Sequence, residues 1–198
     1  NGNFNLDSTT NNVSIISAGS NASRLGSLNF TNSNALVVGS VGSNSGIYTT
    51  GTIAISTLTG DLSVSQNINT QNTSTTALIL NASQSTAAGV SSGGDLKFSG
   101  GASITIGANA RAKLYSGSIS GSTGLTTITG SGSNRFRYNS DESNSNYSLS
   151  LGTGIHAIYR ERPSLTIVAD DKTVTYGTAP TLTTTVNGLQ NGDTAAQT

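Results

Sequence analysis

Residues 53–64, IAISTLTGDLSV, contain the pattern that decides the fold. Ile53 and Ile55 are separated by one small residue, and Leu62 and Val64 repeat that spacing after a turn. Alternation at period two places both apolar side chains of a pair on one face of a short strand. A strand this short buries too little surface to offset the entropy of the chain, so it must stack on others.

The alternating pairs recur along the chain at steps of 24 to 26 residues. One row begins its pairs at Phe4, Leu28, Ile53, Leu78, Ile104 and Ile128. A second row contains Val13, Leu36, Leu62, Leu114 and Phe136, and its missing member falls at either Val90 or Leu96. A repeat of this length is typical of stacked structures in which each turn covers the one below. We therefore predict an all-β fold, a right-handed parallel β-helix of about six 25-residue coils over residues 1–158.

The composition agrees with a stacked fold. Of the 198 residues, 106 are Gly, Ser, Thr or Asn, and only 9% are charged. Disordered chains are usually rich in charge and proline, whereas this chain is polar without being charged. Turns and an outer surface can be built from small polar residues, so a thin apolar stripe that neighbouring coils share is sufficient for the core.

Charge, hydropathy and cysteine content exclude several functions. Nine Lys and Arg balance nine Asp and Glu, so there is no basic surface for a nucleic acid. No window approaches the roughly 18 apolar residues of a membrane-spanning helix, so we do not expect a membrane-embedded protein. Without cysteine there is no disulfide framework and no zinc knuckle, and no cofactor is expected.

The composition changes towards the C-terminus. Seven of the 18 charged residues lie between residues 135 and 162, and longer Thr- and Val-rich strands follow Pro163. Such strands are typical of an antiparallel module. We place a boundary near residues 158–163, with a second, truncated β-rich module over residues 159–198.

The second module resembles a known family. The run Tyr159–Ile167 resembles the entry into an MBG domain of the YGX type, a repeat of very large bacterial surface proteins. The family's pattern continues in order through Val174-Thr175-Tyr176-Gly177, Pro180, Leu182-Thr183 and the run Asn187–Asp193. The resemblance implies that residues 159–198 are the N-terminal part of such a domain.

The upstream segment, with its Asn-, Ser- and Thr-rich coils, resembles the shaft of filamentous-haemagglutinin-like exoproteins. That segment includes Thr59-Gly60-Asp61-Leu62. Those proteins are secreted by the two-partner pathway, so the resemblance implies an outer-membrane secretion pore as a partner and an extracellular location at the bacterial cell surface. It also implies an adhesive role towards surfaces, biofilm matrix or other copies of the protein.

Residues suited to catalysis or metal binding are few. Asp61 and Asp95 share a Gly-Asp-Leu context but stand 34 residues apart, and Asx turns that enter a strand explain both. His156 is the only histidine, which leaves a triad or zinc site without partners. Asp141-Glu142 could bind calcium or lie in a solvated loop. We expect no catalytic residues and no metal site.

Arg135-Phe136-Arg137-Tyr138 is the best candidate for a binding site. Period-two alternation places the two arginines on one face and the two aromatic rings on the other. The arginines could line a patch for an anionic polysaccharide, with Tyr138 as a further contact. Alternatively, the aromatic rings complete the second row of the core and the arginines are simply solvated.

Three functions follow from these observations. The first is a structural and adhesive segment of a large secreted bacterial adhesin, which contacts polysaccharide or other copies of itself. The second is a polysaccharide-binding module that uses Arg135, Arg137 and Tyr138. The third is a polysaccharide-degrading enzyme, which requires a cluster of carboxylates that the spacing does not provide.

Overall fold

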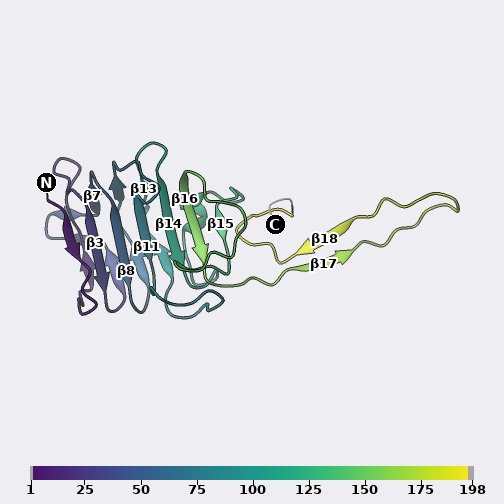
Figure 1. Cartoon of the computed structure of the whole chain (residues 1–198), viewed down its shortest axis with the longest axis horizontal. Coiled ribbons are helices and arrows are strands. Elements are labelled where there is room, and N and C mark those ends of the chain that lie inside the picture. The colour runs from purple at the N-terminus through teal and green to yellow at the C-terminus, as the bar shows by residue number, and fades with distance from the viewer. Residues whose placement is uncertain (1, 196–198) are drawn as a thin grey trace.

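The computed structural model describes residues 2–195 and shows parallel strands stacked side by side along one axis, with a hairpin extending from one end (Figure 1). Within those residues the largest sheet has seven strands, and every pairing in it is parallel. In spatial order the strands are β1 (Phe4–Leu6), β3 (Leu28–Asn32), β8 (Ile53–Thr57), β11 (Leu78–Asn81), β14 (Arg111–Ser116), β16 (Gly154–Tyr159) and β15 (Phe136–Arg137).

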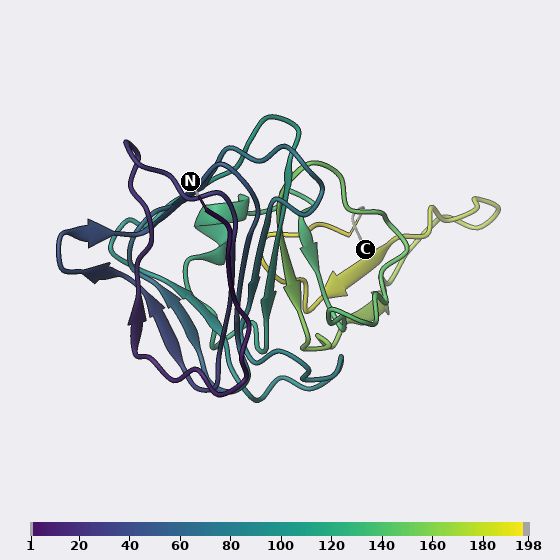
Figure 2. The same cartoon turned by 60° about the vertical axis from the view of Figure 1, so that its left-hand side comes forward.

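Two smaller parallel sheets accompany the large one (Figure 2). One contains, in order, β12 (Leu96–Phe98), β9 (Leu62–Val64), β4 (Leu36–Val38) and β2 (Ile15–Ile16). The other contains β13 (Ile104–Thr105), β10 (Ile68–Thr70) and β7 (Ile47–Thr49). A short antiparallel hairpin, β5 (Ser40–Val41) with β6 (Asn44–Ser45), projects between β4 and β7.

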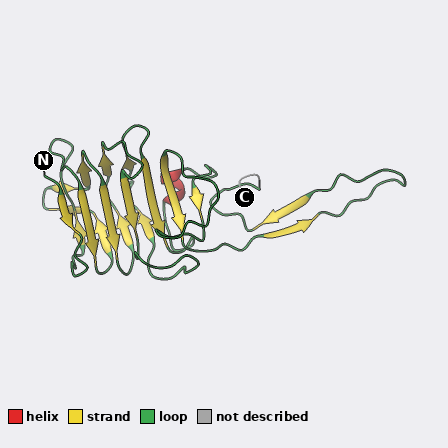
Figure 3. Cartoon of the chain, viewed as in Figure 1, coloured by secondary structure: helices red, strands yellow, loops and turns green. Residues whose placement is uncertain are grey.

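The chain visits the three sheets in turn and then returns to the first. From β8 it runs through β9 and β10 before it reaches β11, which pairs with β8. The expectation of a nearly all-β fold with parallel sheets is therefore confirmed, and the described residues hold one short helix, α1 (Leu125–Thr129) (Figure 3).

The predicted spacing is correct for the first three steps and wrong after them. Phe4 pairs with Leu28, Leu28 with Ile53, and Ile53 with Leu78. Leu78 then pairs with Ala112, 34 residues on, and Ala112 pairs with Ile155. We call one passage of the chain from a strand of the large sheet to the next strand of that sheet a winding. The later windings contain more residues because the segments between their strands form extended turns, which a constant 25-residue repeat does not predict.

The prediction that Ile104 and Ile128 continue the first row of strands is wrong. Ile104 lies in β13, where it pairs with Ile68 rather than with Leu78. Ile128 lies in α1, where residues 125–129 form a single helical turn instead of a strand. Leu125 and Thr129 point into the structure, and the Thr129 hydroxyl donates a hydrogen bond to the Leu125 carbonyl.

The second row is also rearranged. Its missing member is Leu96, which pairs with Leu62, while Val90 lies exposed in a loop. Leu114 pairs with Leu80 in the seven-stranded sheet, and Phe136 pairs with Ala157 there. Val13 is half-exposed outside the strands, and the first strand of this row is β2.

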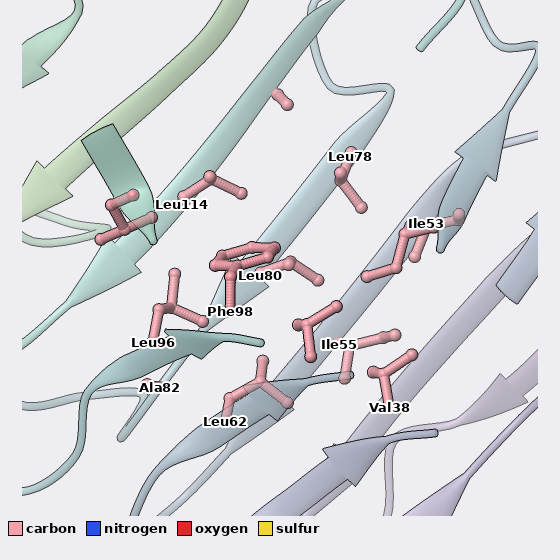
Figure 4. Close-up of a cluster of buried hydrophobic side chains, with 14 of the residues drawn as sticks. Val38, Ile53, Ile55, Leu62, Leu78, Leu80, Ala82, Leu96, Phe98 and Leu114 are labelled. Carbon is pink, nitrogen blue, oxygen red and sulfur yellow. The ribbon is translucent and has the colours of Figure 1, made fainter. Parts of the chain in front are cut away.

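The apolar pairs form one continuous core inside the stack (Figure 4). Alternate residues of each strand point inward, and the inward side chains of successive strands lie beside one another. The fully buried members include Val38, Ile53, Ile55, Leu62, Leu78, Leu80, Leu96 and Leu114. Inward polar residues are satisfied internally: Asn32 binds the backbone of Val13 through both of its amide atoms. A thin stripe of apolar residues therefore suffices for a core.

The two ends of the stack differ. At the N-terminal end Phe4, Leu6 and Ile15 are each more than two-fifths exposed. At the other end Phe136 and Tyr138 stack on Tyr159, with ring centroids 6.4 and 5.7 Å apart. The N-terminal end therefore presents apolar side chains, whereas aromatic rings cover the core at the other end.

The C-terminal hairpin pairs β17 (Thr166–Ala169) with β18 (Thr184–Asn187) in antiparallel register. It extends away from the stack (Figure 1), and nearly all of its strand residues are exposed. Residues 188–193 then return to the end of the stack, where Gly132 N–H donates to the Asn191 carbonyl. The proposed division at residues 158–163 stays a prediction.

Candidate functional site

The predicted binding run, Arg135 to Tyr138, lies at the aromatic end of the stack. Phe136 belongs to the main core, and Tyr138 packs against it. Burial and the neighbouring Asp193 carboxylate raise the pKa of Tyr138, so its phenol stays protonated. The Tyr138 hydroxyl donates to Asp193 Oδ2 at 2.7 Å and accepts from Asn191 Nδ2 at 3.1 Å. Both rings therefore have structural roles.

Arg137 is buried rather than solvated. Its guanidinium donates to the backbone carbonyls of Asn134 and Phe136 and lies over the ring of Tyr147, 5.4 Å from the centroid. An arginine that closes its own local backbone in this way has few donors left for a ligand. The interpretation of a solvated Arg137 is wrong, and its contacts favour a structural role over ligand binding.

Arg135 has a different environment from Arg137. Its guanidinium lies against the backbone of Gly154, where an added Cβ would come within 2.6 Å of Arg135 Nη1. Arg137 and Tyr138 line a cleft of about 280 Å³ together with Tyr147 and Leu149, and Arg135 is not part of its lining. The structure therefore brings two of the three predicted residues together but does not form the expected row of arginines.

Asp141 and Glu142 support the loops beside this end. Asp141 accepts hydrogen bonds from the backbone N–H groups of Ser143, Asn144 and Ala88. Burial opposes ionisation of Asp141, but these N–H groups outweigh it and lower the pKa of the carboxyl. Among residues 2–195 no three His, Asp or Glu side chains gather closely enough to hold a metal ion.

Glu142 is coupled to a buried arginine that the sequence did not single out. Arg160 is fully buried and donates to the carbonyls of Ala82 and Thr86 and to Asn81 Oδ1. Glu142 Oε2 lies 3.4 Å from Arg160 Nη2, and Glu142 Oε1 accepts from the Ser85 backbone. The end of β16 is thereby fastened to the long turn that follows β11.

The two Gly-Asp-Leu triplets stack directly on each other. Leu62 pairs with Leu96, and Asp95 N–H donates to Asp61 Oδ1 at 2.9 Å. Lys97 Nζ lies 2.5 Å from Asp61 Oδ2. Burial raises the pKa of Asp61, but the hydrogen bonds from Lys97 and Asp95 outweigh it, so the net shift is downward.

The recurring glycine in these triplets reflects the close approach of the two turns. A Cβ at Gly94 would lie 2.0 Å from the Gly60 carbonyl oxygen. Asp95 in turn accepts from the backbone N–H of Ser118 at 2.6 Å. The spacing of 34 residues therefore matches one longer winding. Each carboxylate accepts from the backbone of the next turn in the stack, whereas an Asx turn binds the backbone two residues on in the same segment. The Asx-turn interpretation is therefore wrong, although both residues hold turns together.

His156 lies in β16 on the face away from the main core and is only 3% exposed. Neither of its ring nitrogens has a hydrogen-bond partner in the described part of the chain. Burial, followed by the positive charges of Arg137 and Arg135, lowers the pKa of the imidazole, although the nearby backbone of Thr153 and Gly152 opposes this shift in part. A neutral, buried histidine of this kind is a structural residue.

A larger hollow lies on the outer face of the seven-stranded sheet. This outer-sheet groove has a volume of about 570 Å³ and is lined by Asp7, Thr9, Asn29, Thr31, Ala54, Ser56, Leu58, Ile79, Asn81, Gln84, Ser85, Lys113, Tyr115 and Glu142. The sequence alone does not reveal it, because the apolar alternation marks only the inward-facing rows. The outward row between them, Asn29, Ala54 and Ile79 and their neighbours, carries the signal once the register is known.

The exposed end of the stack forms a second hollow. This N-terminal cleft, of about 430 Å³, is lined mainly by apolar side chains, among them Phe4, Leu6, Val13, Ile15, Leu28, Phe30 and Val41. Separately, no helix within residues 2–195 is long and apolar enough to cross a membrane.

Comparison with known proteins assigns one part of the chain. Residues 165–198 match the family model described as MBG domain (YGX type), which confirms that part of the resemblance. Such a match points to a segment of an extracellular surface protein. No curated protein and no solved structure matches the chain.

Proposed function

We propose that the chain is a structural and adhesive segment of a large secreted bacterial adhesin. In this proposal residues 1–158 form a parallel β-helical shaft of about six coils, and the MBG-type module follows it over residues 159–198. The observation that carries the proposal is the match to the MBG family immediately after a stack of parallel strands.

The composition supports secretion and folding outside the cell by the two-partner pathway. A chain without cysteine cannot be trapped by disulfides while it crosses a secretion pore in the outer membrane. Strands that pair in parallel with the preceding winding can add one turn at a time, each on the template of the last. The proposed location is therefore the bacterial cell surface.

A non-catalytic role accords with the state of the acidic side chains. Asp61, Asp95 and Asp141 accept hydrogen bonds from backbone N–H groups, and Glu142 pairs with Arg160. Carboxylates engaged in this way hold turns in place and are poorly free to exchange protons with a substrate.

Other copies of the chain are the partner that the N-terminal cleft fits best. Within the described residues, β1 pairs with β3 on one side and with no strand on the other. Its free backbone groups lie beside the exposed Phe4 and Leu6. An unpaired edge flanked by apolar side chains favours pairing with another strand. The other edge strand of this sheet, β15, has both of its residues buried, so we expect two copies of this 198-residue chain to meet through their N-terminal ends.

Sedimentation velocity over a range of concentrations tests this proposal. The wild-type chain should form a reversible dimer, and beads coated with it should aggregate. Leu6→Lys places a charge in the N-terminal cleft and should abolish both effects. Ile167→Lys, at an exposed apolar position of the hairpin, is the matched control and should change neither. A wild-type chain that stays monomeric, or equal effects of the two variants, would contradict the proposal.

A further inference from the structure

We propose that the outer-sheet groove binds a segment of an extended, uncharged polysaccharide. This inference goes beyond the adhesive role and does not depend on it, because it concerns a different face of the stack from the N-terminal cleft. The volume of the groove, about 570 Å³, lies within the range of small-ligand sites in proteins.

The floor of the groove is formed by outward-facing residues of neighbouring parallel strands. Thr31, Ser56 and Asn81 are adjacent in register on β3, β8 and β11. Tyr115 extends the same row on β14. Neighbouring strands lie about 4.8 Å apart, which is close to the length of one sugar unit in an extended glycan. Ser56 is the most open member of this row, while Thr31, Asn81 and Tyr115 form the deeper part of the floor beside it.

Several polar groups in the groove are free to bind a ligand. Within residues 2–195, the side chains of Thr31, Ser56, Gln84 and Lys113 make no hydrogen bond to the protein. The Tyr115 hydroxyl also has no partner there, and burial raises the pKa of this phenol to about 12, so it can both donate and accept. Hydroxyl and amide groups of this kind suit the hydroxyls of a sugar.

The charges of the groove favour an uncharged ligand. Glu142 lines one part of it, but its carboxylate is paired with the buried Arg160 and the Ser85 N–H. Lys113 provides one positive charge and Asp7 one negative charge. A single balanced pair offers no net attraction for a polyanion. This distinguishes the groove from the row of arginines that the sequence predicted for an anionic ligand.

The shape of the groove is held in place before any ligand arrives. Ser85 in its wall has a φ of 72°, a left-handed conformation that the hydrogen bond from its N–H to Glu142 helps to maintain. Asn81 in the floor is fixed by Arg160. A site whose walls are already ordered loses little conformational entropy on binding.

An added peptide strand is a poorer occupant than a glycan. The floor is the face of a sheet whose strands pair on both sides, so its backbone N–H and C=O groups are already used. A peptide binds sheets mainly by extending an edge, where those groups are free. Side-chain hydroxyls and amides are what this face offers, and those groups match a polysaccharide.

Affinity electrophoresis in gels containing dextran, galactomannan or polygalacturonate tests the inference. At least one of the two neutral polymers should retard the wild-type chain, and polygalacturonate should do so less. Ser56→Trp fills the centre of the groove and should weaken the retardation at least tenfold. Ser63→Trp is the matched control, because Ser63 also points outward, from β9 on another sheet, and is likewise half-buried. Circular dichroism checks that both variants keep the fold.

A milder variant keeps the test informative if Ser56→Trp unfolds the protein. Gln84→Ala removes a free amide without adding bulk, and we expect a two- to fivefold loss of affinity. Absence of retardation by both neutral polymers, retention by polygalacturonate alone, or equal losses in the Ser56 and Ser63 variants would overturn the inference. Loss of self-association in Ser56→Trp without any glycan binding would assign the groove to a second copy instead, and would leave the role of the N-terminal cleft to its own test.

Discussion

The stack and the C-terminal hairpin are built from similar residues but bury them very differently. Ile55 and Leu80 in the stack are fully buried, whereas Ile167 in the hairpin is 68% exposed. Both regions consist of short strands rich in Thr, Val and Ile. The difference lies in the neighbours: each inner strand of the stack has a partner on both sides and a second sheet facing it, while β17 has only β18.

This contrast shows that register, rather than composition, makes the core. A single winding offers only about five inward apolar side chains, such as Ile53, Ile55, Leu62, Val64 and Ile68, which are too few to order the chain on their own. When Phe30, Ile55, Leu80 and Leu114 align in successive strands, each covers the next and the exposed apolar area falls to nearly zero. The hairpin has the alternation without the alignment, so its apolar side chains remain in solvent.

The largest expected effect comes from truncating the shared core. Leu80→Ala removes a fully buried side chain and should lower the free energy of unfolding by about 2–5 kcal/mol. Ile167→Ala in the hairpin should change it by less than about 0.5 kcal/mol, because that side chain is exposed. Urea unfolding followed by circular dichroism measures both, and similar losses would mean that the hairpin packs as the stack does.

Arg160 and Arg162, which follow β16 where the stack meets the C-terminal hairpin, give a second matched pair of variants. Arg160→Ala removes a buried guanidinium that binds the Ala82 and Thr86 carbonyls and Glu142, and should cost about 2–4 kcal/mol. Arg162→Ala, only two residues on and exposed, should have almost no effect. If urea unfolding shows equal losses of stability for the two variants, Arg160 does not hold the end of β16 to the turn that follows β11.

The regular part of the stack could be predicted from the sequence. Steps from Phe4 to Leu78 follow the alternating pairs because every winding there has nearly the same length. The prediction failed at Ile104, since one longer turn shifts every later strand to a new partner. The spacing of 34 residues between the two Gly-Asp-Leu triplets already indicates the longer winding, because Asp61 and Asp95 lie in adjacent turns of the stack.

The binding residues could be predicted less well. Period-two alternation correctly separates Phe136 and Tyr138 from Arg137, but it does not indicate which segments cover the outer face. Residues 147–153 lie against it: Tyr147 and the Leu149 carbonyl contact Arg137, and the backbone of Gly152 and Thr153 lies beside His156. The outer-sheet groove depends on the register of four strands, so it becomes visible only when the lengths of all the windings are known.

Mildly acidic pH should destabilise the stack and leave the hairpin unchanged. The pKa of His156 is lowered in the folded state by burial and by Arg137 and Arg135, with Lys113 beside it on the next strand. The unfolded chain therefore binds the proton more readily, so stability is complete above pH 6.5 and falls as the pH drops below that value.

Thermal unfolding between pH 7 and pH 5 measures this effect. His156→Phe, which replaces the imidazole with an aromatic ring that does not titrate, should remove most of the dependence. In the hairpin, hydrogen bonds from Thr183 and Thr185 lower the pKa of Asp170, so its contribution is lost only below about pH 4. A pH dependence that persists unchanged in His156→Phe would assign it to another group.

The smallest expected effect concerns the link between the two regions. Tyr138 in the stack binds Asp193 and Asn191, which follow the hairpin, through its hydroxyl. Tyr138→Phe keeps the ring stacked on Tyr159 but removes both bonds, at a cost of about 1 kcal/mol. Amide hydrogen exchange over residues 188–193 should then become about fivefold faster, while the melting of the stack changes little. Tyr176→Phe, in the exposed part of the hairpin, should leave exchange unchanged. If exchange over residues 188–193 is the same in both variants, the Tyr138 hydroxyl does not hold this segment, and other contacts, such as that between Gly132 and Asn191, must join the hairpin to the stack.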